Sequence, residues 1–296
     1  MEMMKNNLKE GTRIISVLKT DGYGHGAVQI ARLLQEKDYI WGYATATLDE
    51  AVILRKKGIE KPILVLGTVF PDQRAAMIEH EVRMTLYTEE MAAEVSDLAA
   101  RMGKDVHIHI KLDTGMSRLG FPICEESADA IERISKMPHL QMEGMFTHFA
   151  KADEEDKSFT EKQLNAYLWM KQRLEEKGVQ FSYYHCSNSA GIIDVPEANM
   201  DLVRAGISIY GLYPSGEVNK ANVPLKPALQ WVSHVAHVKW VEAGTPVSYG
   251  GTYVTDRRTK LATIPVGYGD GYPRSLSNKG YVLIKGQKAP IRGRVC

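Results

Sequence analysis

Short apolar runs alternate with amphipathic helical stretches from about residue 14 to residue 212, and this alternation constrains the fold more than any other feature. Residues 158–178 show the helical spacing clearly, because Leu164, Tyr167 and Leu174 recur among charged residues. Alternating strands and helices imply a parallel sheet with right-handed crossovers, and eight strands in about 200 residues fit an α/β fold of the (β/α)8 TIM-like barrel type. The predicted strands are residues 14–19, 39–44, 62–67, 82–87, 106–113, 140–149, 182–188 and 201–207, and the predicted helices are 26–37, 47–58, 71–80, 89–103, 124–136 and 158–178.

A doubly wound open sheet is the alternative that shares this alternation. Such sheets usually have about five to seven strands and a glycine-rich first turn that binds a dinucleotide. The first turn here, Gly22-Tyr23-Gly24-His25-Gly26, is rich in glycine but lacks the G-x-G-x-x-G spacing. The barrel is therefore the favoured interpretation.

The pattern changes after Tyr213, where prolines and glycines form a joint. Short alternating segments without helices follow, which is typical of an antiparallel β domain. We therefore expect a barrel over residues 1–213 and an incomplete, mostly antiparallel C-terminal β domain over 214–296. Because the chain ends directly after a strand-like segment and begins with the end of a helix, we expect short N-terminal and longer C-terminal segments to be lacking. The predicted strands of the β domain are residues 229–240, 246–249, 259–266, 281–285 and 288–295.

Composition excludes several classes of protein. Lys and Arg number 37 and Asp and Glu number 36, so the formal charge of +1 does not predict a nucleic-acid binder. No run of about 18 apolar residues predicts a membrane span, and the first residues do not resemble a secretion signal. The 3 cysteines are widely scattered, which fits a reducing compartment. We expect a cytoplasmic globular protein without nucleic-acid or membrane partners.

Polar residues follow several of the predicted strands at the end where barrel enzymes place their sites. Lys19 closes the first strand, Lys111 and Arg118 follow the fifth, and Arg204 follows the eighth. The cluster suits an anionic ligand. Each arginine could bind a carboxylate or an aromatic nitrogen, or could hold loop carbonyls in place.

Lys19 is the sharpest candidate for chemistry. A lysine at the end of an apolar strand is partly desolvated, which favours the neutral amine that forms Schiff bases with carbonyl cofactors such as pyridoxal phosphate. The alternative is a lysine that merely extends into solvent. His107 and His109 could share a metal ion, but without a third ligand at a suitable spacing we expect no metal.

Taken together, the motifs are similar to those of one family. Val17-Leu18-Lys19, followed by the glycine-rich turn, resembles the cofactor-lysine motif of bacterial alanine racemases. The resemblance covers essentially the whole chain, in family order. The other motifs are Lys111 to Gly120, Thr147-His148-Phe149-Ala150, His185 to Ser189, Val203 to Ile207, Val247-Ser248-Tyr249-Gly250, Pro265 to Gly271 and Gly293 to Cys296.

The resemblance implies an amino-acid racemase that interconverts L-alanine and D-alanine for peptidoglycan by a two-base mechanism. Lys19 would hold pyridoxal 5'-phosphate and act as one base. Tyr249, from the partner subunit of a homodimer with shared active sites, would be the other. The positions that would bind the cofactor phosphate are Tyr23, Ser189, Gly206 and Ile207.

The resemblance also implies roles for four further residues. Arg204 would face the pyridine nitrogen, and Arg118 would lie near the substrate carboxylate. Lys111 matches a lysine that is carbamylated in many family members and that orients this arginine. His148 would tune Tyr249 or Arg204 through a hydrogen bond.

Three alternatives stay open beside alanine racemisation. Serine, or a broad range of amino acids, could be the substrate, because a small pocket rejects one added hydroxyl weakly. A decarboxylase of basic amino acids is disfavoured by Arg204, since a carboxylate there would strengthen the cofactor as an electron sink. A non-catalytic pyridoxal-phosphate carrier would need no β domain. The chain departs from the family pattern at Thr20-Asp21-Gly22 and at Ser117, where glycine is usual, and neither position carries chemistry.

Overall fold

The computed structural model describes all 296 residues. The chain divides into two compact units, Met1–Leu229 and Gln230–Cys296, which are described separately below. None of its helices combines the length and the apolar character needed to cross a membrane.

The first unit is built around eight parallel strands in the order β7-β6-β5-β4-β3-β2-β1-β8. A hydrogen bond of 2.9 Å from the Arg204 amide to the Ser187 carbonyl links β8 to the end of β7, so the sheet nearly closes on itself. The predicted (β/α)8 barrel is confirmed, and the strands lie where they were expected. They are β1 (Arg13–Val17), β2 (Ile40–Thr45), β3 (Ile63–Val65), β4 (Arg83–Leu86), β5 (Val106–Lys111), β6 (Leu140–Phe146), β7 (Tyr183–His185) and β8 (Leu202–Ala205).

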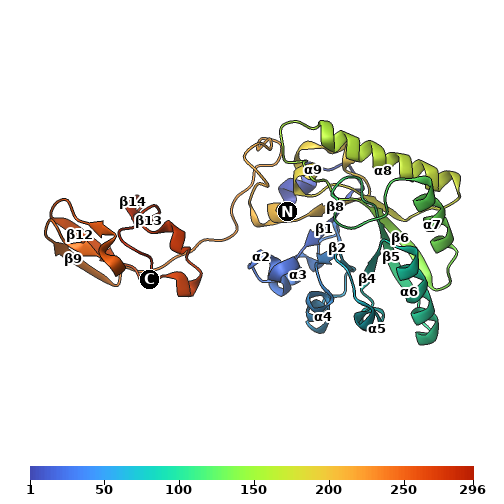
Figure 1. Ribbon diagram of the computed structural model, residues 1–296, viewed down its shortest axis with the longest axis horizontal. Coiled ribbons are helices and arrows are strands. Elements are labelled where there is room, and N and C mark those ends of the chain that lie inside the picture. The colour runs from blue at the N-terminus through green and yellow to red at the C-terminus, as the bar shows by residue number, and fades with distance from the viewer. The chain divides into compact units, whose positions relative to one another are not determined.

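Helices surround the strands on the outside of the barrel, as Figure 1 shows. Two apolar layers result, since strand residues alternate between the barrel interior and the helices. The interior layer contains Ile15, Trp41 and Leu64, and the outer layer contains their neighbours Ile14 and Ile63. The helices are α1 (Glu2–Asn6), α2 (Lys19–Tyr23), α3 (Ala27–Gln35), α4 (Leu48–Lys56), α5 (Arg74–Glu79), α6 (Glu89–Met102), α7 (Glu125–Ser135), α8 (Ser158–Glu176) and α9 (Ser189–Asp194).

The second unit consists of three separate two-stranded antiparallel sheets. The predicted strand 229–240 is wrong over its first part, because only residues 237–241 pair. Their partner, β12, is five residues long and pairs Thr263 with His237 at its end, so no partner remains for residues 229–235. The predicted strand 288–295 likewise ends at Pro290. The strands are β9 (His237–Val241), β10 (Pro246–Val247), β11 (Tyr253–Val254), β12 (Thr259–Thr263), β13 (Tyr281–Ile284) and β14 (Gln287–Pro290).

Candidate active site

Most of the predicted site residues meet at the end of the barrel where the strands finish. The surroundings of His148, two residues beyond β6, show this convergence. Burial and four surrounding positive charges hold the pKa of His148 well below its ordinary value, and these charges belong to Arg204, Lys111, Arg118 and Lys19. The imidazole is therefore neutral at physiological pH. Four basic side chains around one neutral ring make a site for a strongly anionic ligand.

Lys19 lies two residues beyond the end of β1 and is followed by a left-handed turn that the sequence did not predict. Thr20, Asp21 and Gly22 have φ of 52°, 50° and 62° with ψ of 49°, 49° and 43°. A left-handed conformation costs roughly 1–2 kcal/mol for each residue that carries a Cβ. This turn takes the place of the first turn of an ordinary helix, directly after Lys19.

Two carboxylates hold this turn in place. Glu50, in α4, accepts a hydrogen bond of 2.5 Å from the Thr20 amide and another of 2.8 Å from the Ala46 amide. Asp21 accepts one of 2.8 Å from the Ala27 amide, at the start of α3. Glu50 was missed as a site residue, although the Thr47-x-x-Glu50 spacing marks it as part of a helix capping box.

Tyr23, Ser189 and Gly206 form a small cradle of hydroxyl groups and backbone amides. The Ser189 hydroxyl oxygen accepts hydrogen bonds from the amides of Gly206 at 2.9 Å and Ser208 at 3.3 Å. A Cβ at Gly206 would lie 3.2 Å from the Tyr23 hydroxyl oxygen, so a larger residue would have to push that hydroxyl aside. Ile207, the next residue, begins the short 3₁₀ helix η3 (Ile207–Tyr210).

Arg204 is the more deeply buried of the two arginines in the cluster, and its guanidinium is surrounded by hydrogen-bond acceptors. It donates to Thr147 O and Cys186 O, at 2.5 and 2.8 Å, and to the carbonyl of His185 at 3.0 Å. It also donates to His185 Nδ1 at 2.8 Å. Burial lowers the pKa of Arg204 to about 10, so the guanidinium is charged at neutral pH although no carboxylate pairs with it directly.

The cluster contains two lysines, Lys19 and Lys111, and Lys111, at the end of β5, is the buried one. Lys19 is partly exposed, whereas Lys111 is 3% exposed and donates to Leu112 O at 3.0 Å. Burial, with the nearby charges of Arg204 and Arg118, lowers the pKa of Lys111 to about 7. About half of its amines are thus uncharged near neutral pH, which gives this lysine a nucleophilic form.

Arg118 and Tyr249 lie in more open surroundings. Arg118 is exposed, on a loop that Asp113 braces by accepting hydrogen bonds of 3.0 Å from the amides of Gly115 and Ser117. Tyr249 belongs to the second unit, is 70% exposed and begins the 3₁₀ helix η4 (Tyr249–Gly251).

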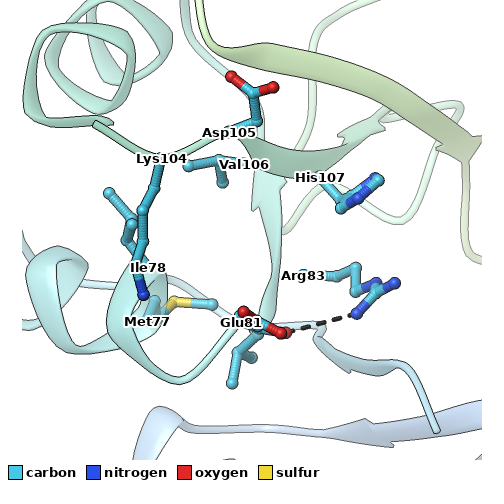
Figure 2. Close-up of a pocket in the computed structure, with 9 residues that line it drawn as sticks. Met77, Ile78, Glu81, Arg83, Lys104, Asp105, Val106 and His107 are labelled. Carbon is cyan, nitrogen blue, oxygen red and sulfur yellow. Dashed lines mark hydrogen bonds between the residues drawn. The ribbon is translucent and has the colours of Figure 1, made fainter. Parts of the chain in front are cut away.

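A cavity of about 330 Å³ lies at the opposite end of the barrel, where β4 and β5 begin. Figure 2 shows Arg83, Glu81, Lys104 and His107 around it. Its side chains are none of the predicted site residues, so it is separate from the cation cluster.

Comparison with known proteins agrees with the whole architecture. A family model described as alanine racemase, N-terminal domain, matches residues 1–214, and one described as alanine racemase, C-terminal domain, matches 228–296. The alanine racemase of Desulforamulus reducens is 44% identical over 303 residues, which cover 100% of this chain and 82% of that protein. The alanine racemase of Clostridium tetani is 45% identical over 297 residues, covering 100% and 76%.

Solved structures show the same likeness. Alanine racemase of Clostridium difficile 630 superposes with a TM-score of 0.94 at 41% identity, covering 100% of this chain and 77% of that chain. Its complex with cycloserine gives a TM-score of 0.92 at 40% identity, with coverage of 100% and 76%. Alanine racemase of Bacillus anthracis with bound L-Ala-P gives 0.87 at 34% identity, with coverage of 100% and 78%.

Proposed function

The chain belongs to the alanine racemase family, and we propose that it performs the reaction of that family with pyridoxal 5'-phosphate bound above the barrel and with Lys19 and Tyr249 as its two bases. Racemisation of alanine is the activity of this isomerase. Residues 1–213 would bind the cofactor, and residues 214–296 would supply the tyrosine. The cation cluster around His148 is the observation that carries the proposal.

The residues at this end of the barrel fit pyridoxal phosphate. The cradle of Tyr23, Ser189, Gly206 and Ile207 suits the phosphate, because Gly206 leaves space that a Cβ would fill, and the Ser189 hydroxyl, already accepting two amide hydrogens, has its own proton free to donate. Arg204 offers a buried donor for the ring nitrogen. Lys19 would hold the cofactor, which when bound withdraws electrons from the substrate Cα and makes its proton acidic.

Two bases on opposite faces explain racemisation. Lys19 Nζ removes or returns the Cα proton on one face, and the hydroxyl oxygen of the partner subunit's Tyr249 does so on the other. One base alone could exchange the proton but would return it to the same face. This division requires a homodimer in which each active site takes one residue from the second unit of the partner.

Arg204 favours racemisation over the alternative, decarboxylation of basic amino acids. Its guanidinium can donate a hydrogen bond but cannot accept one, so a ring nitrogen facing it stays unprotonated. A carboxylate at that position would hold a proton on the nitrogen and strengthen electron withdrawal, which favours decarboxylation and other side reactions. Arg204 therefore supports reversible proton transfer at Cα.

Lys111 supports carbamylation. Its pKa of about 7 leaves a neutral amine, which can add to carbon dioxide to give a carbamate and release one proton. The product carries a negative charge between Arg204 and Arg118 in place of a positive one, so repulsion becomes attraction. The carbamate would orient Arg118 toward the substrate carboxylate. His148, 3.4 Å from the Arg204 guanidinium and neutral, would complete this arrangement.

L-Alanine is the substrate that the family predicts, and serine is the second candidate because it adds only one hydroxyl. We place the reaction in the cytoplasm, where D-alanine would supply peptidoglycan synthesis. The first test is proton NMR of L-alanine in deuterated buffer with the chain and pyridoxal phosphate, followed by chiral analysis. Loss of the Cα proton together with D-alanine supports the two-base mechanism. Cofactor binding without exchange would favour the carrier and contradict the proposal.

A further inference from the structure

A chain of hydrogen bonds runs through the barrel beneath Arg204, with one residue from each of four neighbouring strands. From β8, Arg204 donates to His185 Nδ1 at 2.8 Å. His185, at the end of β7, contacts His109 of β5 across 2.9 Å, between Nε2 and Nδ1. His109 Nε2 lies 3.0 Å from a carboxylate oxygen of Glu143, in β6. Both rings are fully buried.

The two ends of the chain determine which ring nitrogens carry protons. A guanidinium can only donate, so His185 Nδ1 must be the unprotonated nitrogen. Burial, chiefly, together with the charge of Arg204, holds the pKa of His185 well below its ordinary value, so the neutral ring carries its one proton on Nε2. That proton is donated to His109 Nδ1. His109, also neutral because burial lowers its pKa, then carries its proton on Nε2 and donates it to Glu143.

Glu143 is suited to terminate this chain. Burial alone would raise the pKa of its carboxyl, but the hydrogen bond from His109 and the charge of Arg83 bring it below the ordinary value, so it is ionised at neutral pH. Arg83 Nε lies 3.3 Å away and His107 Nδ1 lies 3.5 Å away. Both of these side chains line the cavity at the far end of the barrel (Figure 2), so Glu143 stands between that cavity and the buried rings.

We propose that Glu143 is a positioning residue for Arg204, acting through the fixed tautomers of His109 and His185. Were His109 to reverse its tautomer, it would donate to His185 Nε2, and the proton of His185 would then face the Arg204 guanidinium donor to donor. An acceptor at Glu143 removes this alternative, because only the productive tautomer of His109 can donate to it. The catalytic consequence rests on the proposed role of Arg204 at the cofactor ring.

Aromatic packing does not explain the chain by itself. Phe146 stacks on His185 with centroids 4.8 Å apart and planes 6° apart, and Trp41 meets the edge of His109 at 5.6 Å. These contacts hold the planes of the rings. They do not distinguish one ring nitrogen from the other, whereas a carboxylate at one end and a guanidinium at the other do.

The test reads the tautomers directly. The full chain, labelled with ¹⁵N-histidine and measured with and without pyridoxal phosphate, gives spectra that show which nitrogen of each ring is protonated. We expect the proton on Nε2 in both His109 and His185 at pH 7. Glu143→Met, which removes the acceptor at similar length, should give His185 mixed tautomers and lower kcat roughly three- to thirtyfold with little change in KM. Glu143→Gln, which keeps one acceptor oxygen, should retain the tautomers and most of kcat.

Asp105→Asn is the matched control, because Asp105 lies at the same end of the barrel but pairs with His139 outside the chain. It should change neither the tautomers nor kcat. A wild-type His185 protonated on Nδ1 would overturn the proposal, even if Glu143→Met failed to fold. A folded Glu143→Met variant with unchanged tautomers and kcat would overturn it too. Because the spectra need neither cofactor nor turnover, they separate failure of this proposal from failure of the proposed function.

Discussion

The two units of the molecule bury their residues very differently. In the barrel, most strands pair on both sides, and β2, for example, is buried along its full length from Ile40 to Thr45. In the second unit every sheet has only two strands, and Trp231 and Trp240 are about half exposed, at 49% and 56%. Two-stranded sheets have little apolar surface to bury in common. The barrel thus carries its own core, whereas the second unit leaves several large side chains exposed, Tyr249 among them at 70%.

The largest expected effect comes from removing the proposed bases, one in each unit. Lys19→Ala should abolish exchange of the alanine Cα proton in both enantiomers, with a loss on the order of 10³-fold or more, because it removes both a base and the attachment point of the cofactor. Tyr249→Phe should abolish inversion but leave exchange from one enantiomer. Deuterium incorporation followed by NMR with chiral analysis measures both. Full racemisation by the Tyr249→Phe variant would contradict the assignment of the second base.

How much of this comparison the sequence could predict also differs between the units. The barrel strands were located well because each is a compact apolar run between helices of clear period, as in β2 and α8. The strands of the second unit were predicted less accurately, since the alternating pattern continues through residues 229–235, where no partner strand exists. Local patterning predicts the capacity to form a strand, and pairing decides whether the strand forms.

The candidate site shows the same boundary between local and distant information. The sequence predicts three of the site residues because they lie at strand ends, namely Lys19, Lys111 and Arg204. The barrel fold then predicts that they converge. The left-handed turn after Lys19 could not be predicted, because the carboxylate that accepts the Thr20 amide comes from Glu50, 30 residues away. The hydrogen-bond chain from Glu143 to His185 could not be predicted from the sequence either, since its members come from different strands.

The next effect concerns the buried charge that only the barrel contains. Because Lys111 has a pKa of about 7 when folded and an ordinary value of 10.5, the unfolded chain binds more protons between these pH values. The free energy of unfolding should therefore rise with pH across this window, by about 1.4 kcal/mol for each unit of pKa difference at most. Below pH 7 both states are protonated and the stabilising increment is absent.

Lys111→Met removes this titration, so its free energy of unfolding should lack the rise. Denaturant titrations of both proteins from pH 6 to 10.5, in buffer free of carbon dioxide to prevent carbamylation, measure the difference. Parallel curves for the two proteins would show that Lys111 keeps an ordinary pKa. The second unit has no buried lysine, so Lys260→Met in β12 serves as the control and should run parallel to the wild type.

Cofactor affinity should belong to the barrel. Gly206→Val places side-chain atoms against the Tyr23 hydroxyl, which a Cβ alone would approach to 3.2 Å. Overpacking of about 1–3 kcal/mol corresponds to a loss of roughly fivefold to 150-fold in affinity for pyridoxal phosphate, measured by absorbance titration. Gly216→Val, where a Cβ would meet nothing within 4 Å, should bind normally, and so should Tyr249→Phe. Equal losses of cofactor affinity in Gly206→Val and Gly216→Val would contradict the assignment of the cradle as the phosphate site.

A matched pair of valines tests the difference in burial itself. Val203 in β8 is 0% exposed, and Val238 in β9 is 46% exposed. Val203→Ala should lower the free energy of unfolding by about 2 kcal/mol, since it removes buried methyl groups and leaves a cavity. Val238→Ala should cost less than about 1 kcal/mol. Chemical denaturation measures both, and a larger cost at Val238 would show that this face of β9 is covered in the assembled protein.

The smallest effects come from one strained serine in each unit. Ser117, in the barrel loop that carries Arg118, has φ of 55°, and Ser248, next to Tyr249, has φ of 65° with ψ of −177°. Ser117→Gly relieves its strain without breaking a side-chain hydrogen bond and should stabilise the barrel by about 1 kcal/mol. Ser248 lies in a region that only glycine enters freely, but its hydroxyl donates to Arg294 O at 2.7 Å. Relief and loss offset each other there, so denaturation of Ser248→Gly should show little net change. If kcat of Ser248→Gly falls although its stability is unchanged, the strained backbone at Ser248 orients Tyr249. The second unit would then be ordered locally around its proposed base.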